Sequence, residues 1–192
     1  MLQKMKAFYA RVLQCISAHA IWIVLAAMAL AVVPFLLISI YSRPCVDDFS
    51  YSISLYHMVQ SGSGNLFALL KEAARVDISY YHSWQGLYTS AFVLALQPGI
   101  FGERYYFIGT VLLMVLMAVC LYYFVSACFD RLGVSLSKAY CAAILLTAFL
   151  QGLPSMAEGL YWFNGAWNYM PFFFLILVNI GLVLRFTAPS GK

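Results

Sequence analysis

The chain has 192 residues, of which 64% are hydrophobic, and its mean hydropathy is +0.86. Soluble proteins contain only about 45 to 50% apolar residues, so this composition excludes an ordinary soluble domain. The formal net charge of +4 comes from basic residues scattered singly between apolar runs. That pattern is typical of membrane orientation and not of nucleic-acid binding. The composition therefore predicts an integral membrane protein.

The first apolar segment follows three basic residues, Lys4, Lys6 and Arg11, and extends over residues 18–41. This length is sufficient to cross about 30 Å of hydrocarbon. A cleavable signal peptide would have a shorter apolar run followed by a small-residue cleavage motif, which is not found here. We therefore predict a first membrane-spanning helix over residues 18–41.

Residues 42–104 form a mixed region that is too polar to be embedded in lipid. From Leu66 to Val76, apolar residues recur at helical spacing, and Asn65 offers an N-cap directly before them. This pattern predicts an amphipathic helix lying at the membrane interface. A weaker second interfacial helix is expected over residues 49–59.

The later apolar segments predict further spans over residues 105–129, 139–153 and 170–184. The run over residues 86–96 is shorter and is interrupted by polar residues, which favours an interfacial piece. If it does not cross, most basic residues collect on one side of the membrane and most acidic residues on the other. We therefore predict one all-α membrane domain over residues 1–192, a helical bundle of about four spans with both termini cytoplasmic.

The outer face of this topology brings two loops together. Asp47 and Asp48 follow the first span, and the later loop begins with Glu158. Sugar transfer needs a base near the acceptor proton, hydrogen-bonding groups for sugar hydroxyls and flat apolar surfaces. The later loop supplies amide and aromatic candidates for substrate binding: Trp162, Asn164, Trp167 and Asn168.

Structural roles also fit these residues. Asp47 or Asp48 is suited to cap the helix expected to begin at Phe49. Trp162 and Trp167 would fit an aromatic belt at the headgroup level, and Glu158 would fit a solvated loop. The two alternatives remain open at each position.

An arginine and the paired aspartates are further candidates for binding a phosphate or a metal ion. Arg104 opens the second span and suits the phosphate of a lipid-linked donor, although arginines also snorkel at helix ends. Paired carboxylates suit a hard divalent cation such as Mg or Mn, but no ligand spacing requires one. His82 is interpreted as structural.

Five features together resemble the bacterial polytopic GT-C superfamily of glycosyltransferases. They are the long first span, the Asp-Asp-aromatic element at residues 47–49, the interfacial helices, the Trp-x-Gly turn at residues 84–86, and the Glu-x-x-x-Trp-x-x-Gly-x-x-Asn-Tyr loop at residues 158–169. Within this superfamily, the chain resembles membrane proteins of unknown function and glucosyltransferase-like membrane proteins. The resemblance covers nearly the whole chain.

The resemblance implies a protein of the bacterial cytoplasmic (inner) membrane. It would transfer a sugar from a polyprenyl-phosphate donor to a glycan or lipid acceptor at the outer face of that membrane. The resemblance also implies that Asp47 and Asp48 act at the acceptor or bind metal, that Glu158 is a second carboxylate, and that Trp84 lies near substrate. Members of the superfamily have more spans, so we expect this chain to be the N-terminal part of a larger fold and inactive alone. The alternative is a non-enzymatic subunit or carrier that binds a glycan or lipid through its outer loops.

Overall fold

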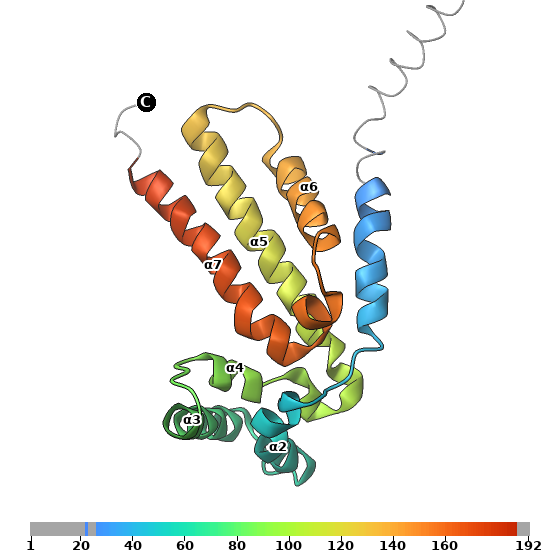
Figure 1. Cartoon of the computed structure of the whole chain (residues 1–192), viewed down its shortest axis with the longest axis vertical. Helices are drawn as coiled ribbons and strands as arrows, with labels where there is room; N and C mark the ends of the chain where they lie inside the picture. Colours follow the sequence, from blue (N-terminus) through green and yellow to red (C-terminus); the bar gives the residue numbers. More distant parts are fainter. Residues whose placement is uncertain (1–21, 23–25, 188–192) are drawn as a thin grey trace, which may run out of the picture.

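The computed structural model describes residues 22 and 26–187, and every regular element in this part of the chain is a helix (Figure 1). The all-α prediction is therefore confirmed for the described residues. In chain order the elements are a first helix over Ala26–Ser39, α2 (Asp47–Gln60), α3 (Leu66–Ser83), α4 (Ser90–Ala95), the 3₁₀ turns η1 (Pro98–Phe101) and η2 (Glu103–Tyr105), α5 (Phe107–Leu132), α6 (Lys138–Gln151), the π-helical turn η3 (Ala157–Tyr161) and α7 (Phe163–Phe186).

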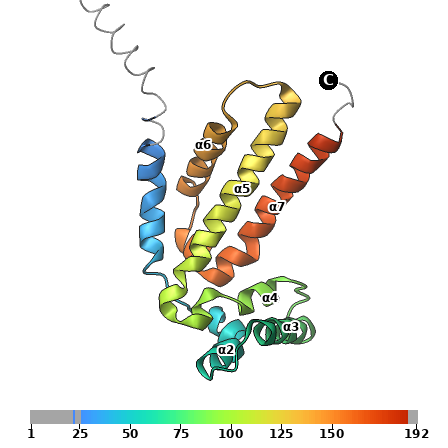
Figure 2. The same ribbon diagram turned by 180° about the vertical axis from the view of Figure 1, so that it is seen from behind.

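Helices α5, α6 and α7 run side by side, while α2, α3 and α4 lie across one end of them (Figures 1 and 2). Helix α5 packs mainly against α7 and then against α6. The connection from α6 to α7, which includes η3, lies at the same end as α2. The two loops predicted to share one face therefore do lie at one end of the molecule.

Two helices are long and apolar enough to cross a membrane, and they cover Glu103–Leu132 and Phe163–Phe186. Each carries an exposed apolar stripe at helical spacing, as expected for a surface that contacts lipid. The stripe on α5 contains Leu112, Val115, Val119 and Tyr122, and the stripe on α7 contains Phe172, Ile176, Ile180 and Val183.

The other predicted spans are not established. Helix α6 has 14 residues, a length of about 21 Å at 1.5 Å per residue, against about 30 Å of hydrocarbon. Residues 18–21 and 23–25 of the first predicted span lie outside the described residues, and the apolar helix seen there covers Ala26–Ser39. Helix α7 begins at Phe163 and not near residue 170, so most of the predicted aromatic loop is helical.

The layer formed by α2, α3 and α4 agrees largely with the sequence pattern. Asn65 caps α3, because its side-chain Oδ1 accepts a hydrogen bond from the Ala68 amide at 2.9 Å. Leu69 and Val76 of the predicted stripe are buried, whereas Leu66 is exposed. Within residues 86–96, only the six residues of α4 are α-helical, too few to cross a membrane.

Two hydrophobic clusters hold these parts together. The first lies between the layer and the lower ends of α5 and α7, and includes Leu55, Tyr106 and Phe163. The second lies between α5, α6 and α7, with Phe174 at its centre. Trp167 packs against both clusters. The start of α7 is therefore the point where the layer is joined to the long helices.

Basic and acidic side chains also meet at the opposite end of the long helices. The Lys138 ammonium and the Arg185 guanidinium both face Asp130, and the Arg185 distance is 3.7 Å. These groups lie where α5 ends, α6 begins and α7 ends, far from α2 in Figure 1. Among the described residues, this end carries more basic than acidic groups, since Arg131 lies beside Asp130 in the sequence.

Replacing Gly109 by Ala should destabilise the contact between α5 and α7. A Cβ at this position would lie 2.6 Å from Phe163 Cδ2 and 2.7 Å from its Cε2, which is closer than any real contact. Overpacking of this kind costs about 1 to 3 kcal/mol. The control is Val119→Ala on the exposed face of α5, and circular dichroism during heating in detergent should show a lower midpoint for Gly109→Ala only. Equal midpoints would contradict the packing.

Candidate functional site

Asp48 is the polar centre of the contact between the layer and the long helices. Its side chain is 2% exposed, and its Oδ2 accepts hydrogen bonds from the Tyr106 hydroxyl at 2.5 Å and the Cys45 amide at 3.1 Å. Its Oδ1 accepts a hydrogen bond from the Asn164 amide at 2.9 Å. One carboxylate therefore joins the start of α2, the start of α5 and the start of α7.

The same group caps α7. The first amides of a helix have no partner within the helix, and a negative charge is stabilising there. The Asn164 amide donates to Asp48, and the Phe163 amide donates to the Tyr106 hydroxyl at 2.7 Å. Asp48 and Tyr106 therefore satisfy the first two amides of α7 from a distant part of the sequence. We infer a structural role for Asp48 as a cap of α7, whereas the sequence predicted either a cap of its own helix or a group that acts at the acceptor or binds metal.

Burial raises the pKa of the Asp48 carboxyl above its ordinary value. The hydrogen bonds from Tyr106, Cys45 and Asn164 act in the opposite direction, because they stabilise the charged form, and the charge of Asp47 adds a smaller increase. The desolvation of the charged carboxylate is thus the largest influence, although three donors surround it.

The start of α2 differs from the expected cap. The helix begins at Asp47, its N-cap is Val46, and no side chain accepts a capping hydrogen bond there. Val46 has a φ of 46°, a conformation that β-branched residues rarely adopt because it is strained. The bond from the Cys45 amide to Asp48 spans this strained residue. The strained backbone of Val46 therefore directly precedes Asp47 and Asp48, and the hydrogen bond from Cys45 to Asp48 stabilises it.

Asp47 has a different environment from its neighbour. Its side chain is exposed, and its Oδ2 lies 3.4 Å from the Asn164 side-chain Nδ2, which donates a hydrogen bond to it. Burial and then the nearby charge of Asp47 raise the pKa of Tyr80, whose ring stacks on Tyr51 with centroids 4.3 Å apart. An exposed carboxylate and a side-chain amide therefore meet here, near the stacked rings of two tyrosines.

Glu158 lies in η3 and is exposed, beside a groove of about 280 Å³. Trp162, Gly165 and Tyr169 line this groove, and they share one face of the first turns of α7. Asn164, which contacts the aspartates, points from the other side of those turns. The structure therefore brings Asp47, Asp48 and Asn164 together, and among the described residues no hydrogen bond joins Glu158 to them.

The remaining predicted residues have varied positions. The Trp167 indole donates to the Gly109 carbonyl at 3.1 Å and stacks on Phe163, so its contacts are with the protein core. Trp162 lines the Glu158 groove, and its indole nitrogen is buried without a partner among the described residues. Asn168 is half-buried on α7 and has no hydrogen bond to the aspartates.

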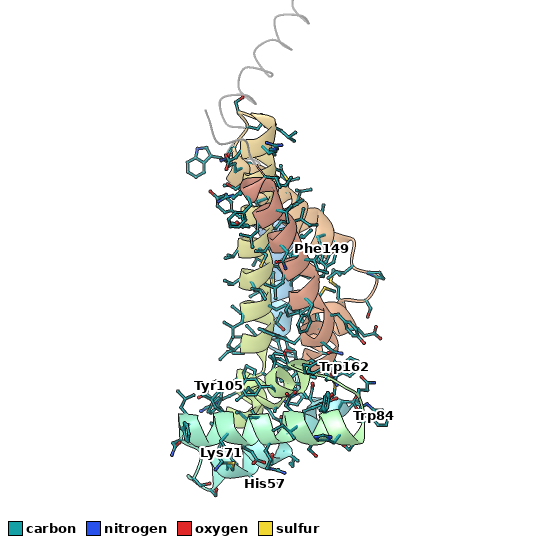
Figure 3. The ribbon with its side chains drawn as sticks, turned by 90° about the vertical axis from the view of Figure 1, so that its left-hand side faces the viewer. His57, Lys71, Trp84, Tyr105, Phe149 and Trp162 are labelled. Carbon is teal, nitrogen blue, oxygen red and sulfur yellow. The ribbon has the colours of Figure 1, made fainter. Side chains whose placement is uncertain are left out.

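Two predicted substrate contacts lie at the surface. The Arg104 guanidinium donates to the Tyr105 hydroxyl at 2.8 Å and stacks over the same ring, while remaining exposed. Trp84 is exposed at the C-terminal end of α3, as Figure 3 shows. No hydrogen bond joins either residue to the Asp48 cluster in the described part of the chain.

Tyr106, Tyr51 and Tyr80 were not identified from the sequence. Tyr51 lies one helical turn after Asp47, a spacing that places the two side chains on one face. Tyr106 stands at the beginning of a long apolar run, where its hydroxyl needs a partner once the residue is buried. Neither pattern indicates which distant residue the tyrosine contacts.

The donor set around the aspartates does not fit a resident metal ion. Both oxygens of Asp48 already accept hydrogen bonds from N–H and O–H groups, which leaves Asp47 as the free carboxylate. Among residues 26–187, no three His, Cys, Asp or Glu side chains lie close enough to hold a metal. We therefore derive no step that requires Mg or Mn.

Comparison with protein families, with curated proteins and with solved structures finds no match to this chain. The class is therefore defined by the structure: an all-helical protein with two helices able to cross a membrane.

Proposed function

We propose that the chain is a multi-pass membrane protein of about four spans that transfers a sugar from a polyprenyl-phosphate donor to an acceptor hydroxyl. The proposal is supported by one observation above the others. Asp47 is a free carboxylate that lies beside the Asn164 amide and the stacked rings of Tyr51 and Tyr80. These are the groups needed to bind a sugar and to remove a proton from it.

In the proposed reaction, Asp47 accepts the proton of the acceptor hydroxyl. The hydroxyl oxygen forms a bond to the anomeric carbon of the donor sugar, and the bond from that carbon to the phosphate oxygen breaks. The polyprenyl phosphate leaves with the electron pair. Asn164 orients the acceptor, and Arg104, exposed in η2 just before α5, is the group that we assign to the donor phosphate.

Asp48 has a positioning role in this proposal. Its three hydrogen bonds hold α2 against α7, and α7 supplies Asn164. The distance between the Asp47 carboxylate and the Asn164 amide therefore depends on Asp48. A glycan or lipid at the outer membrane surface is the expected acceptor.

A second function, binding without catalysis, is favoured by the environment of Asp48. Its carboxylate accepts three hydrogen bonds from the protein, which is the environment of a structural residue. A non-enzymatic subunit or carrier would use the groove beside Glu158 and the exposed stripe on α7 to bind a glycan, a lipid or a partner helix. The test is transfer, in vesicles that contain a radiolabelled polyprenyl-phosphate sugar, by this chain within the larger protein that the resemblance implies. Sugar bound without any turnover would favour the second function and reject the first.

The proposed topology predicts which positions can be labelled from outside intact bacterial cells. In a background without native cysteines, Ser155→Cys should react with an impermeant maleimide, because residue 155 lies at the same end as α2. Ser135→Cys, in the connection between α5 and α6, should react only after permeabilisation. External labelling of Ser135→Cys without Ser155→Cys would reverse the orientation and remove the outer-face site.

A further inference from the structure

A second cavity lies on the opposite face of α2 from Asp47 and Tyr51. It has a volume of about 190 Å³, which is room for about six water-sized groups. Helix α2 contributes residues at i, i+3, i+4 and i+7, which share one face. The lining residues are Pro44, Phe49, Ser52, Ile53, Tyr56, Gln97, Gly99 and Glu103.

Gln97 supplies a buried polar atom in the wall of this cavity. The residue is 1% exposed, and its Oε1 has no hydrogen-bond partner among the described residues. A Cβ built on Gly99 would lie 3.1 Å from this oxygen and 3.0 Å from Pro44 Cγ, and all three residues line the cavity. A buried carbonyl oxygen without a partner is costly, so its position in the wall suggests a ligand.

The amide of Gln97 cannot be turned around to remove this oxygen. Its Nε2 donates to the Asp48 carbonyl at 3.0 Å and to Ser52 Oγ at 2.8 Å. The Ser52 hydroxyl hydrogen is already donated to the Asp48 carbonyl at 2.6 Å. A reversed amide would place Oε1 against the carbonyl oxygen, so Oε1 keeps its position in the cavity wall beside Gly99.

The second polar group is the carboxylate of Glu103, which is exposed at the mouth of the cavity. It forms no ion pair with another described residue, since the neighbouring Arg104 is held against Tyr105. Phe49 and Tyr56 provide aromatic walls that are partly open to the surroundings. The cavity therefore offers two acceptors without a partner, the neutral amide oxygen of Gln97 in its wall and the carboxylate of Glu103 at the surface. The aromatic rings of Phe49 and Tyr56 also line it.

We propose that this cavity binds a primary ammonium group, as carried by an ethanolamine headgroup. An ammonium has three N–H donors and one positive charge, which suit an amide oxygen, a carboxylate and aromatic faces. The group has two sources, an aminophospholipid in the membrane or a small soluble amine. This site lies behind α2 and does not depend on the sugar-transfer proposal.

The test uses the full chain, purified in detergent, and calorimetric titration with four probes. The probes are ethanolamine, choline, phosphatidylethanolamine in mixed micelles and phosphatidylcholine in the same micelles. Ethanolamine-type probes should bind at least about tenfold more tightly than choline-type probes, because choline has no N–H donor. Binding of the phospholipid alone assigns a lipid source, and binding of the soluble amine assigns a soluble one. Equal binding of choline and ethanolamine would overturn the proposal.

Two variants test separately whether binding needs the charge of Glu103 and the room beside Gly99. Glu103→Gln keeps the shape of an exposed side chain and removes its charge, so ammonium binding should weaken about tenfold. Gly99→Ala would place a methyl group 3.1 Å from Gln97 Oε1, which blocks this acceptor, so ammonium binding should weaken. The matched control is Glu72→Gln, which removes the same charge from α3 outside the cavity wall and should leave ammonium binding unchanged. If Glu103→Gln binds as tightly as the unaltered protein, or if Glu72→Gln weakens binding equally, the assignment is rejected.

Discussion

Replacing Asp48 by Asn should lower the free energy of unfolding by about 1 to 3 kcal/mol, the cost of a buried donor without a partner. If the Asn oxygen accepts from the Asn164 amide, the Asn NH₂ group points at the Cys45 amide, which is also a donor. If the side chain is reversed, the NH₂ group points at the Asn164 amide. Neither orientation satisfies all the donors that now surround the carboxylate.

The role of Tyr106 allows this effect to be assigned to the cluster. Tyr106→Phe removes the donor to Asp48 and the acceptor of the Phe163 amide, so it should destabilise by a similar amount. Because both residues belong to one network, the double variant should cost less than the sum of the two single variants. Circular dichroism during denaturation in detergent measures all four proteins. Additive effects would show that the cluster does not act as a unit.

The pH dependence provides a second readout. Burial raises the pKa of Asp48, so the folded chain holds this proton more tightly than the unfolded chain. The stabilisation linked to the proton is complete below the unfolded pKa and is lost as pH rises through the folded pKa. Asp48→Asn has no group that titrates there, so its stability should fall less over the same range. An unchanged slope would contradict the burial of this carboxyl.

Local patterns in the sequence were sufficient for several elements. The Asn65 cap and the stripe ending at Val76 predicted α3, and the long apolar runs predicted α5 and α7. The interfacial interpretation of residues 86–96 is consistent with the short helix α4. These features depend on neighbouring residues, so spacing alone can indicate them.

The function of Asp48 could not be predicted in the same way. Its partners Tyr106 and Asn164 are 58 and 116 residues away along the chain. The aspartates looked equivalent in the sequence, yet consecutive helical residues point in directions about 100° apart. One is therefore buried against α7 and the other is exposed. Glu158 was predicted as a second carboxylate of this site, and among the described residues no hydrogen bond joins it to either aspartate.

Asp47 is exposed whereas Asp48 is buried, so we expect the second large effect, a loss of sugar transfer, from a change at Asp47. Asp47→Asn should reduce sugar transfer by about 10² to 10⁴-fold, because Asn cannot accept the proton of the acceptor hydroxyl. Stability should hardly change, since the Asp47 side chain is exposed and bonded only weakly to Asn164 at 3.4 Å. Transfer to a lipid or glycan acceptor in vesicles measures the rate, and circular dichroism checks the fold.

The matched control for Asp47→Asn is Glu72→Gln, which removes one carboxylate from the same layer. Glu72 pairs with Arg75 on α3 at 2.6 Å, within one helix, and such pairs contribute little to stability. Glu72→Gln should therefore retain both the fold and the transfer rate. Full transfer by Asp47→Asn would reject Asp47 as the base. A loss of transfer in Asp48→Asn, together with lower stability, is expected from its positioning of α7, so the two aspartates are distinguished by stability and not by rate alone.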